Sequence, residues 1–218
     1  MSEPQLNSHE QAFYNDGYRL GEQAAKYRSD EKKFLGYVRE MLKSVDELII
    51  MLEQHATRQG VSIDCKKGCG FCCYQAVFAN SYEFHLLSDF MKKKFTPAQR
   101  ERVKEAASTK YTHTETLDEQ EVLNHKEACP LLVDESCSAY PARPMACRIY
   151  LSTKLESCLS FYHEPAKEES IPQLLEFPLS AGRMMNEGFT AALRENGIEI
   201  AELRLEEGLR TVLTHGVR

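Results

Sequence analysis

Residues 63–75 read IDCKKGCGFCCYQ and place four cysteines, Cys65, Cys69, Cys72 and Cys73, within nine positions. Ligand residues two or three positions apart allow a chain to wrap one ion or cluster without strain. Thiolates are soft, anionic ligands that suit zinc, cuprous copper and iron–sulfur clusters. This stretch therefore predicts a metal-binding loop around which the rest of the fold is built.

Two features of this loop concern its geometry. Gly68 and Gly70 flank Cys69, and glycines permit the left-handed turns and close backbone approach that such a loop needs. The adjacent pair Cys72 and Cys73 is harder to place on one ion, because neighbouring side chains diverge by about 100° in a helix and oppose each other in a strand. Either Cys73 is a small buried core residue, or the pair faces two metals or two edges of a polynuclear cluster.

A second group of cysteines, Cys129, Cys137 and Cys147, lies in ACPLLVDESCSAYPARPMACR at residues 128–148. This spacing alone is weak evidence for a metal site. Beside the first group it supplies three more thiols, and we expect the two groups to converge in space. No helical period is clear here, and the two prolines of YPARP exclude a regular helix.

Basic residues flank both groups of thiols: Lys66, Lys67, Arg143 and Arg148. Several thiolates around one or two dications leave surplus negative charge, which nearby cations would offset. The alternative is that the lysines are solvated and the arginines form salt bridges with Asp134 or Glu135.

The remaining candidate ligands are less convincing. Cys158, in KLESCLSFY, is expected to be a core residue of a short helix rather than a ligand. The seven histidines lie outside the cysteine groups and show no paired ligand spacing. His125, four residues before Cys129, is the nearest in sequence, and we expect it on the surface.

Composition and charge restrict the class of protein. The chain has 218 residues, suits one domain, and carries a formal net charge of −6, which argues against nucleic-acid binding driven by bulk charge. The start, MSEPQLNSHEQ, lacks the features of a secretory signal, and the longest apolar run, LIIML at 48–52, cannot span a bilayer. We therefore expect a cytoplasmic protein without a membrane partner, whose clustered, reduced thiols serve metal or redox chemistry. The sequence identifies no protein partner.

Helical patterns surround the cysteines. Residues 8–58 predict two helices, and in the second the apolar residues from Phe34 to Leu52 recur at steps of three and four before a stop at Gly60. Residues 170–216 predict two further helices, closing at Gly197 and Gly216.

Two helix starts are predicted between these segments. Asn80 with Glu83 three residues later, and Thr96 with Gln99, are capping-box patterns. The fold class is therefore mainly α, with a helical hairpin and C-terminal helices packed around an irregular cysteine-rich metal-binding centre. We divide the chain into a hairpin at 1–60, a cysteine-cluster domain at 61–160 and helices at 161–218 that pack on it as one compact unit.

The two cysteine groups together resemble the YkgJ-like cysteine-cluster family, the zinc- or iron-chelating domain. The resemblance rests on an ordered series of elements: CKKGCGFCC, Glu83, CPLL, CSAY, Arg143-Pro144 and Cys147-Arg148. It covers residues 65–150 and departs from the family label in one respect, three residues rather than two between Cys65 and Cys69. The resemblance implies a zinc or iron site. Relatives of the family include flagellin lysine methylases that depend on an iron–sulfur cluster, but these are longer proteins, so the resemblance does not carry their activity over to this chain.

Three functions follow from these observations. The first is a metal-binding protein with an iron or iron–sulfur site in a redox or metal-handling role, whose ligands are seven cysteines: Cys65, Cys69, Cys72, Cys73, Cys129, Cys137 and Cys147. The second is an iron–sulfur-dependent enzyme such as a methyl transferase or oxidoreductase, for which no independent active-site motif exists. The third is a structural zinc domain that acts as an interaction module. Seven thiols exceed the four that a structural zinc needs, which favours a polynuclear or two-metal site without choosing iron over zinc.

Overall fold

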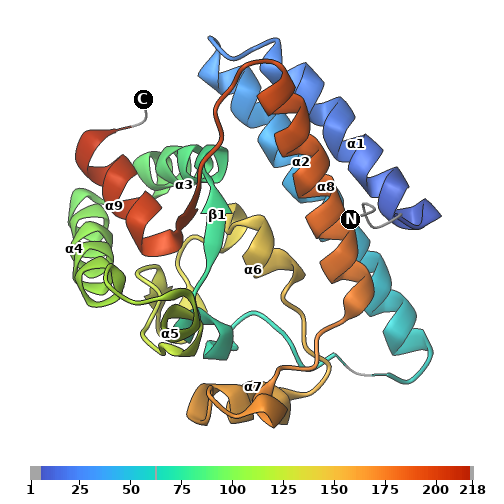
Figure 1. Ribbon diagram of the computed structural model, residues 1–218, viewed down its shortest axis with the longest axis vertical. Coiled ribbons are helices and arrows are strands. Elements are labelled where there is room, and N and C mark those ends of the chain that lie inside the picture. Colours follow the sequence, from blue (N-terminus) through green and yellow to red (C-terminus); the bar gives the residue numbers. More distant parts are fainter. Residues whose placement is uncertain (1–5, 62, 217–218) are drawn as a thin grey trace.

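Nine α-helices make up most of the part of the chain that the computed structural model describes, residues 6–61 and 63–216 (Figure 1). The helices are α1 (Ser8–Ala25), α2 (Glu31–Arg58), α3 (Ser81–Lys94), α4 (Pro97–Thr114), α5 (Glu119–Asn124), α6 (Met145–Ile149), α7 (Leu155–His163), α8 (Glu176–Glu195) and α9 (Leu205–His215). The short strands are β1 (Phe78–Asn80), β2 (Leu132–Val133), β3 (Ser136–Cys137) and β4 (Glu202–Arg204), and the 3-10 turns are η1 (Phe71–Tyr74), η2 (Tyr140–Ala142) and η3 (Glu168–Ser170). The predicted mainly α fold class is confirmed, while residues 1–5 of the predicted hairpin and residues 217–218 lie outside the described part.

Helices α1, α2 and α8 lie side by side and form one wall of the molecule (Figure 1). Glycines let α1 and α8 approach to backbone contact: a Cβ on Gly17 would lie 1.9 Å from the carbonyl oxygen of Met185. A Cβ on Gly188 would lie 2.0 Å from that of Tyr14. The apolar stripe of α2 is buried as predicted, with Val38 and Met41 fully shielded from solvent.

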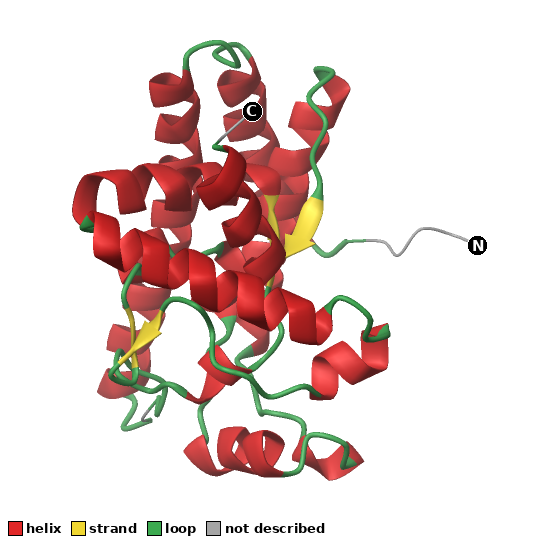
Figure 2. Ribbon diagram, turned by 90° about the vertical axis from the view of Figure 1, so that its left-hand side faces the viewer, coloured by secondary structure: helices red, strands yellow, loops and turns green. Residues whose placement is uncertain are grey.

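Helices α3, α4 and α9 form a second group on the other side of the molecule (Figure 1), the side that faces the viewer in Figure 2. Phe84 of α3 packs directly against Gly208 of α9, where a Cβ would meet the ring at 2.2 Å. Strands β1 and β4 pair antiparallel beside this group, with Phe78 opposite Arg204.

The sequence prediction for the C-terminal segment is wrong in one part. The last helix begins only at Leu205, and residues 202–204 are extended. Their backbone groups pair with β1, a partner more than a hundred residues earlier, and this pairing replaces the hydrogen bonds of a helical turn. The predicted C-terminal ends of these two helices are confirmed. Gly197 follows α8 and Gly216 follows α9, with φ values of 72° and 73°.

Both predicted capping boxes are present. Thr96 caps α4, and its backbone N–H donates to the side chain of Gln99 at 2.8 Å. Asn80 caps α3, and its backbone N–H donates to the carboxylate of Glu83 at 2.8 Å. Unlike most capping carboxylates, Glu83 is only 2% exposed, and it lies beside the cysteine-bearing segments.

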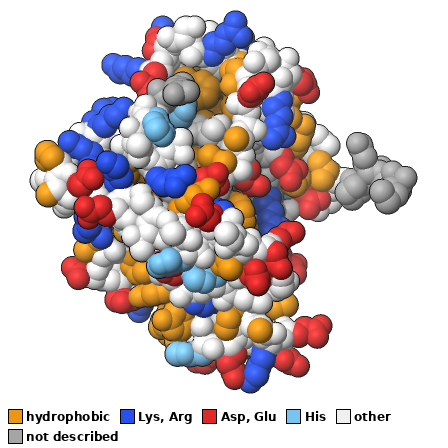
Figure 3. Space-filling model, turned by 60° about the vertical axis from the view of Figure 1, so that its left-hand side comes forward, with side chains coloured by type: hydrophobic (Ala, Val, Ile, Leu, Met, Phe, Trp, Pro, Cys, Tyr) orange, Lys and Arg blue, Asp and Glu red, His pale blue; other side chains and the backbone are white. Residues whose placement is uncertain are grey.

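The hydrophobic core is continuous from Leu20 in α1 to Val212 in α9 and includes residues of all three predicted segments. The division at residues 60 and 160 stays a prediction. None of the described helices is both long and apolar enough to cross a membrane. On the face drawn in Figure 3, basic and acidic side chains are interspersed.

Candidate metal centre

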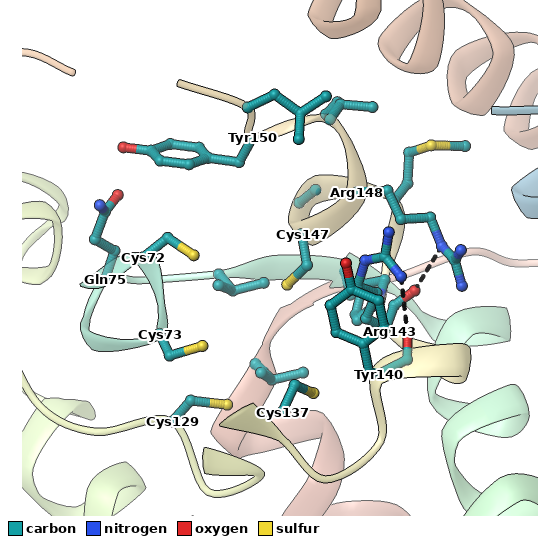
Figure 4. A pocket seen from close by; sticks show the side chains of 18 of the residues that line it. Cys72, Cys73, Gln75, Cys129, Cys137, Tyr140, Arg143, Cys147, Arg148 and Tyr150 are labelled. Atoms are coloured by element: carbon teal, nitrogen blue, oxygen red, sulfur yellow. Dashed lines mark hydrogen bonds between the residues drawn. The ribbon is translucent and has the colours of Figure 1, made fainter. Parts of the chain in front are cut away.

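The cysteine-bearing segments meet at one cavity of about 610 Å³. All seven predicted ligands line it: Cys65, Cys69, Cys72, Cys73, Cys129, Cys137 and Cys147. Figure 4 shows that the side chains of the last five come from three separate stretches of chain and face a common space. The structure therefore brings the two groups together, while metal ligation by each residue stays a prediction.

The first stretch is shaped by tight turns. The backbone N–H of Cys69 donates to the carbonyl of Lys66 at 3.0 Å, and Gly68 between them has a φ of 94°. The one-turn 3-10 helix η1 then carries Cys72 and Cys73. Gly70, just before it, is so close to the side chain of Glu135 that a Cβ would lie 2.5 Å from a carboxylate oxygen.

A backbone hydrogen bond joins the first stretch to the second. The N–H of Cys129 donates to the carbonyl of Cys73 at 2.7 Å. Beyond Cys129, β2 and β3 form a small hairpin in which Cys137 pairs with Leu132. The hairpin turns through Asp134 and Glu135, whose positive φ values of 47° and 58° match a two-residue turn. This turn places Cys137 opposite the loop of Cys69.

Cys147 lies in a helix, which corrects the prediction that the prolines exclude one. Pro144 caps α6, and the helix begins at the next residue, Met145. A proline at this position does not disrupt the helix, because the cap residue donates no helical hydrogen bond. The free backbone N–H of Met145 donates to the Glu83 carboxylate at 2.7 Å. Helix α3 therefore positions the first turn of α6, and with it Cys147.

The arginines form salt bridges, though with a different partner from the one predicted. Arg143 and Arg148 both donate to the carboxylate of Asp46 in α2, at 3.1 Å for Arg143, rather than to Asp134 or Glu135. Arg148 is 2% exposed and also donates to the carbonyls of Pro141 and Arg143, both at 2.9 Å. The pair joins the loop before Cys147 to α2, while Glu135 of the hairpin turn lies against Gly70 instead.

Most of the clustered thiols resist deprotonation when no cation is nearby. Burial raises the pKa of Cys65 to about 11 and that of Cys129 to about 12, and it raises the pKa of Cys147 well above the ordinary value. Cys72 is the exception, because a hydrogen bond with Cys73 lowers its pKa and raises that of Cys73. A bound metal would supply the positive charge that stabilises the thiolates.

The donor set fits zinc or iron in its chemistry, since both metals bind clustered thiolates. Within residues 6–61 and 63–216, however, no three Cys, His, Asp or Glu side chains already stand at the spacing of ligands to a single ion. Binding one ion would therefore draw thiols closer together, whereas a cluster core separates its ligands more widely.

Sequence reasoning missed several residues of this region. Asp46 carries no local signal, because its arginine partners lie about a hundred positions away. Arg183 and Asn186 of α8 also line the cavity. His125 is half-buried, and its Nε2 lies 2.8 Å from Glu127; it does not line the cavity. Lys66 and Lys67 are exposed, as the solvated alternative expected.

Comparison with known proteins gives one match. Residues 64–170 match the family model CxxCxxCC, described as "Putative zinc- or iron-chelating domain". No curated protein and no solved structure matches the chain. The matched residues include every cysteine discussed above and agree with the resemblance seen in the sequence. Residues 64–170 of the chain therefore carry the CxxCxxCC domain of that description.

Proposed function

We propose that the chain binds iron, as an iron–sulfur cluster, through the thiols of the 610 Å³ cavity, and that it serves in redox chemistry or metal handling. The observation that carries the proposal is the convergence of seven thiols from three stretches of chain on one cavity. Free cysteines are usually scattered small core residues, and this number exceeds the four that a structural zinc needs.

The number of thiols supports a cluster rather than one ion, because seven line the cavity. An iron–sulfur cluster is held by four thiolates, and when bound it supplies one-electron transfer. The protein's own residues would hold the ligands in place, through Glu83 behind Cys147 and the Cys129–Cys73 backbone hydrogen bond.

The cavity also favours a second candidate, an enzyme that acts on a small molecule beside the metal. Its volume lies within the range of small-molecule sites, and apolar residues line much of it, among them Val77, Leu131 and Leu179. Arg183 and Asn186 add polar groups at its α8 side. A methyl-transfer or oxidoreductase reaction would use this space, whereas a purely structural zinc domain would leave it without a role.

The test is the metal content of anaerobically purified protein. We expect iron with acid-labile sulfide and visible absorption in the parent chain. Cys129→Ser and Cys147→Ser should each lose most of the iron, because each removes a thiolate from the shared cavity. Ser136→Ala is the control, since it alters the hairpin that follows Cys129 without removing a thiol.

Each outcome decides between the functions. Iron and sulfide that are retained in Ser136→Ala and lost in the two cysteine variants support the proposal. Zinc without iron would favour the structural alternative. A parent chain with neither metal would contradict metal binding altogether.

A further inference from the structure

Behind the cysteine loop lies a second, much smaller cavity of about 20 Å³. Four thiols line it: Cys65, Cys69, Cys72 and Cys158. Cys158 is buried in α7 and was expected from the sequence to be an ordinary core residue. Cys158 nevertheless lies beside three other thiols.

Specific contacts hold α7 against the loop. The backbone N–H of Leu155, at the start of α7, donates to the carboxylate of Asp64 at 3.0 Å. One residue further along the loop, the N–H of Cys65 donates to the carbonyl of Ser152 at 3.3 Å. These two hydrogen bonds hold the start of α7, the helix of Cys158, close to Cys65.

Aromatic rings make the same connection at the other end of the loop. Tyr162 of α7 packs edge-on against Phe71 and Tyr74 of η1, with ring centroids 5.7 and 5.1 Å apart. Because η1 also carries Cys72, the ring contacts fix the distance between Cys72 and the helix of Cys158.

The eight cysteines divide between the two cavities. Those that line only the larger cavity are Cys73, Cys129, Cys137 and Cys147. Cys158 lines only the smaller cavity, and the three thiols of the loop, Cys65, Cys69 and Cys72, line both. Of the adjacent pair, Cys72 lines both cavities and Cys73 lines only the larger one.

We propose that Cys65, Cys69, Cys72 and Cys158 form a second metal centre, a closed four-thiolate site for a single zinc ion, separate from the iron–sulfur site. The inference deepens the proposed function and rests on it for the remaining four thiols, which suffice for one cluster. The small cavity has room for about one water-sized sphere, so it admits an ion and excludes a polynuclear core.

Four thiolates without an open position are typical of structural zinc. On binding, each thiol releases its proton to solvent, and four sulfur–zinc bonds form. The exposed Lys66 and Lys67, next to Cys65, offset part of the surplus negative charge. The spacing of the thiols must tighten as the ion binds, because no three of the described side chains already match a single ion.

The experiment measures zinc, iron and sulfide per chain in the anaerobically purified full-length protein and two variants. Cys158→Ser should lose the zinc and keep the iron and sulfide. Cys147→Ser should do the opposite, because Cys147 lines only the larger cavity. Circular dichroism of each variant checks that the helices remain folded.

A ligand-swap variant separates ligation from packing. In Cys158→His an imidazole replaces the thiolate, so a metal should still bind. After replacement of zinc by cobalt, the sulfur-to-cobalt absorption should weaken and shift relative to the parent. An unchanged cobalt spectrum would show that residue 158 does not touch the metal and would overturn the inference.

The outcomes distinguish this inference from the proposed function. One outcome is iron without zinc in the parent, with the iron content unchanged in Cys158→Ser. This result overturns the second centre and leaves the proposed function standing. Zinc that is lost in Cys158→Ser from a chain without iron supports the second centre and contradicts the iron–sulfur proposal. A chain that binds neither metal contradicts both.

Discussion

The buried carboxylate of Glu83 accepts the backbone N–H of Met145 at 2.7 Å, which links the first turn of α3 to the first turn of α6 two residues before Cys147. The same carboxylate accepts the N–H of Asn80 at 2.8 Å. One side chain thus satisfies backbone donors at the starts of two helices, although Glu83 and Met145 are 62 positions apart in the chain. Burial raises the pKa of Glu83, and the two N–H donors oppose that rise.

Glu83→Ala should therefore lower the free energy of unfolding by roughly 2–4 kcal/mol, because it leaves two buried N–H groups without an acceptor. It should also weaken metal retention at Cys147. Urea unfolding of the metal-free chain measures the first effect and metal content the second. Glu10→Ala removes a comparable capping carboxylate at the exposed start of α1 and should cost less. Equal stability of Glu83→Ala and the parent would contradict this role.

Asp46→Ala should destabilise the chain by about 2 kcal/mol or more, because it leaves the buried guanidinium of Arg148 without its counter-ion. The matched control is Asp89→Ala, which breaks ion pairs with the more exposed Arg39 and Lys93 and should cost less than about 1 kcal/mol. Thermal unfolding of both variants provides the comparison. Equal shifts in the two variants would mean that burial of Arg148 contributes nothing.

Stability of the metal-free chain should fall as the pH rises above about 9. Burial raises the pKa of Cys65 to about 11 and of Cys129 to about 12, from an ordinary value of 9.0. The unfolded chain then releases these protons first, so the stability that neutral thiols contribute is full below pH 9 and is lost toward pH 11–12. Urea unfolding at a series of pH values measures the slope, which should be shallower in Cys129→Ala. An equal slope in that variant would exclude Cys129 as a source.

The metal-loaded chain should respond in the opposite direction. Ligand thiols must be deprotonated, so protons compete with the metal, and the metal should be lost as the pH falls. Visible absorption during acid titration follows the loss. Metal that is retained down to a pH at which carboxylates are also protonated would argue against thiolate ligation.

Gly17→Ala and Gly188→Ala should each destabilise the α1–α8 contact, since the added methyl group would lie about 2 Å from a backbone carbonyl oxygen. Gly36→Ala, in α2, is the control. Its Cβ would meet nothing within 4 Å, and alanine favours a helix over glycine by about 1 kcal/mol, so this variant should be more stable than the parent. Thermal unfolding distinguishes the two directions.

Much of the helical structure was predictable because its causes are local. The apolar stripe of α2, the boxes at Asn80 and Thr96, and the glycine stops at Gly197 and Gly216 depend on residues within a few positions of one another. The same holds for the crowding of Cys65 to Cys73, whose chemistry is readable from spacing alone. The helix at Cys147 does not follow from such patterns, because two nearby prolines disfavour a helix, although Pro144 stands just before its start.

By itself, the sequence determined that the chain is mainly α-helical and that its clustered thiols suit a metal, since periodicity, capping and ligand spacing are properties of short segments. Only the tertiary structure decided that Asp46 is the partner of Arg148, that residues 202–204 pair with β1, and that Cys158 lies beside Cys65. Each of these depends on contacts between residues tens to more than a hundred positions apart. Such contacts are set by how the helices pack into one continuous core, and no local pattern encodes them.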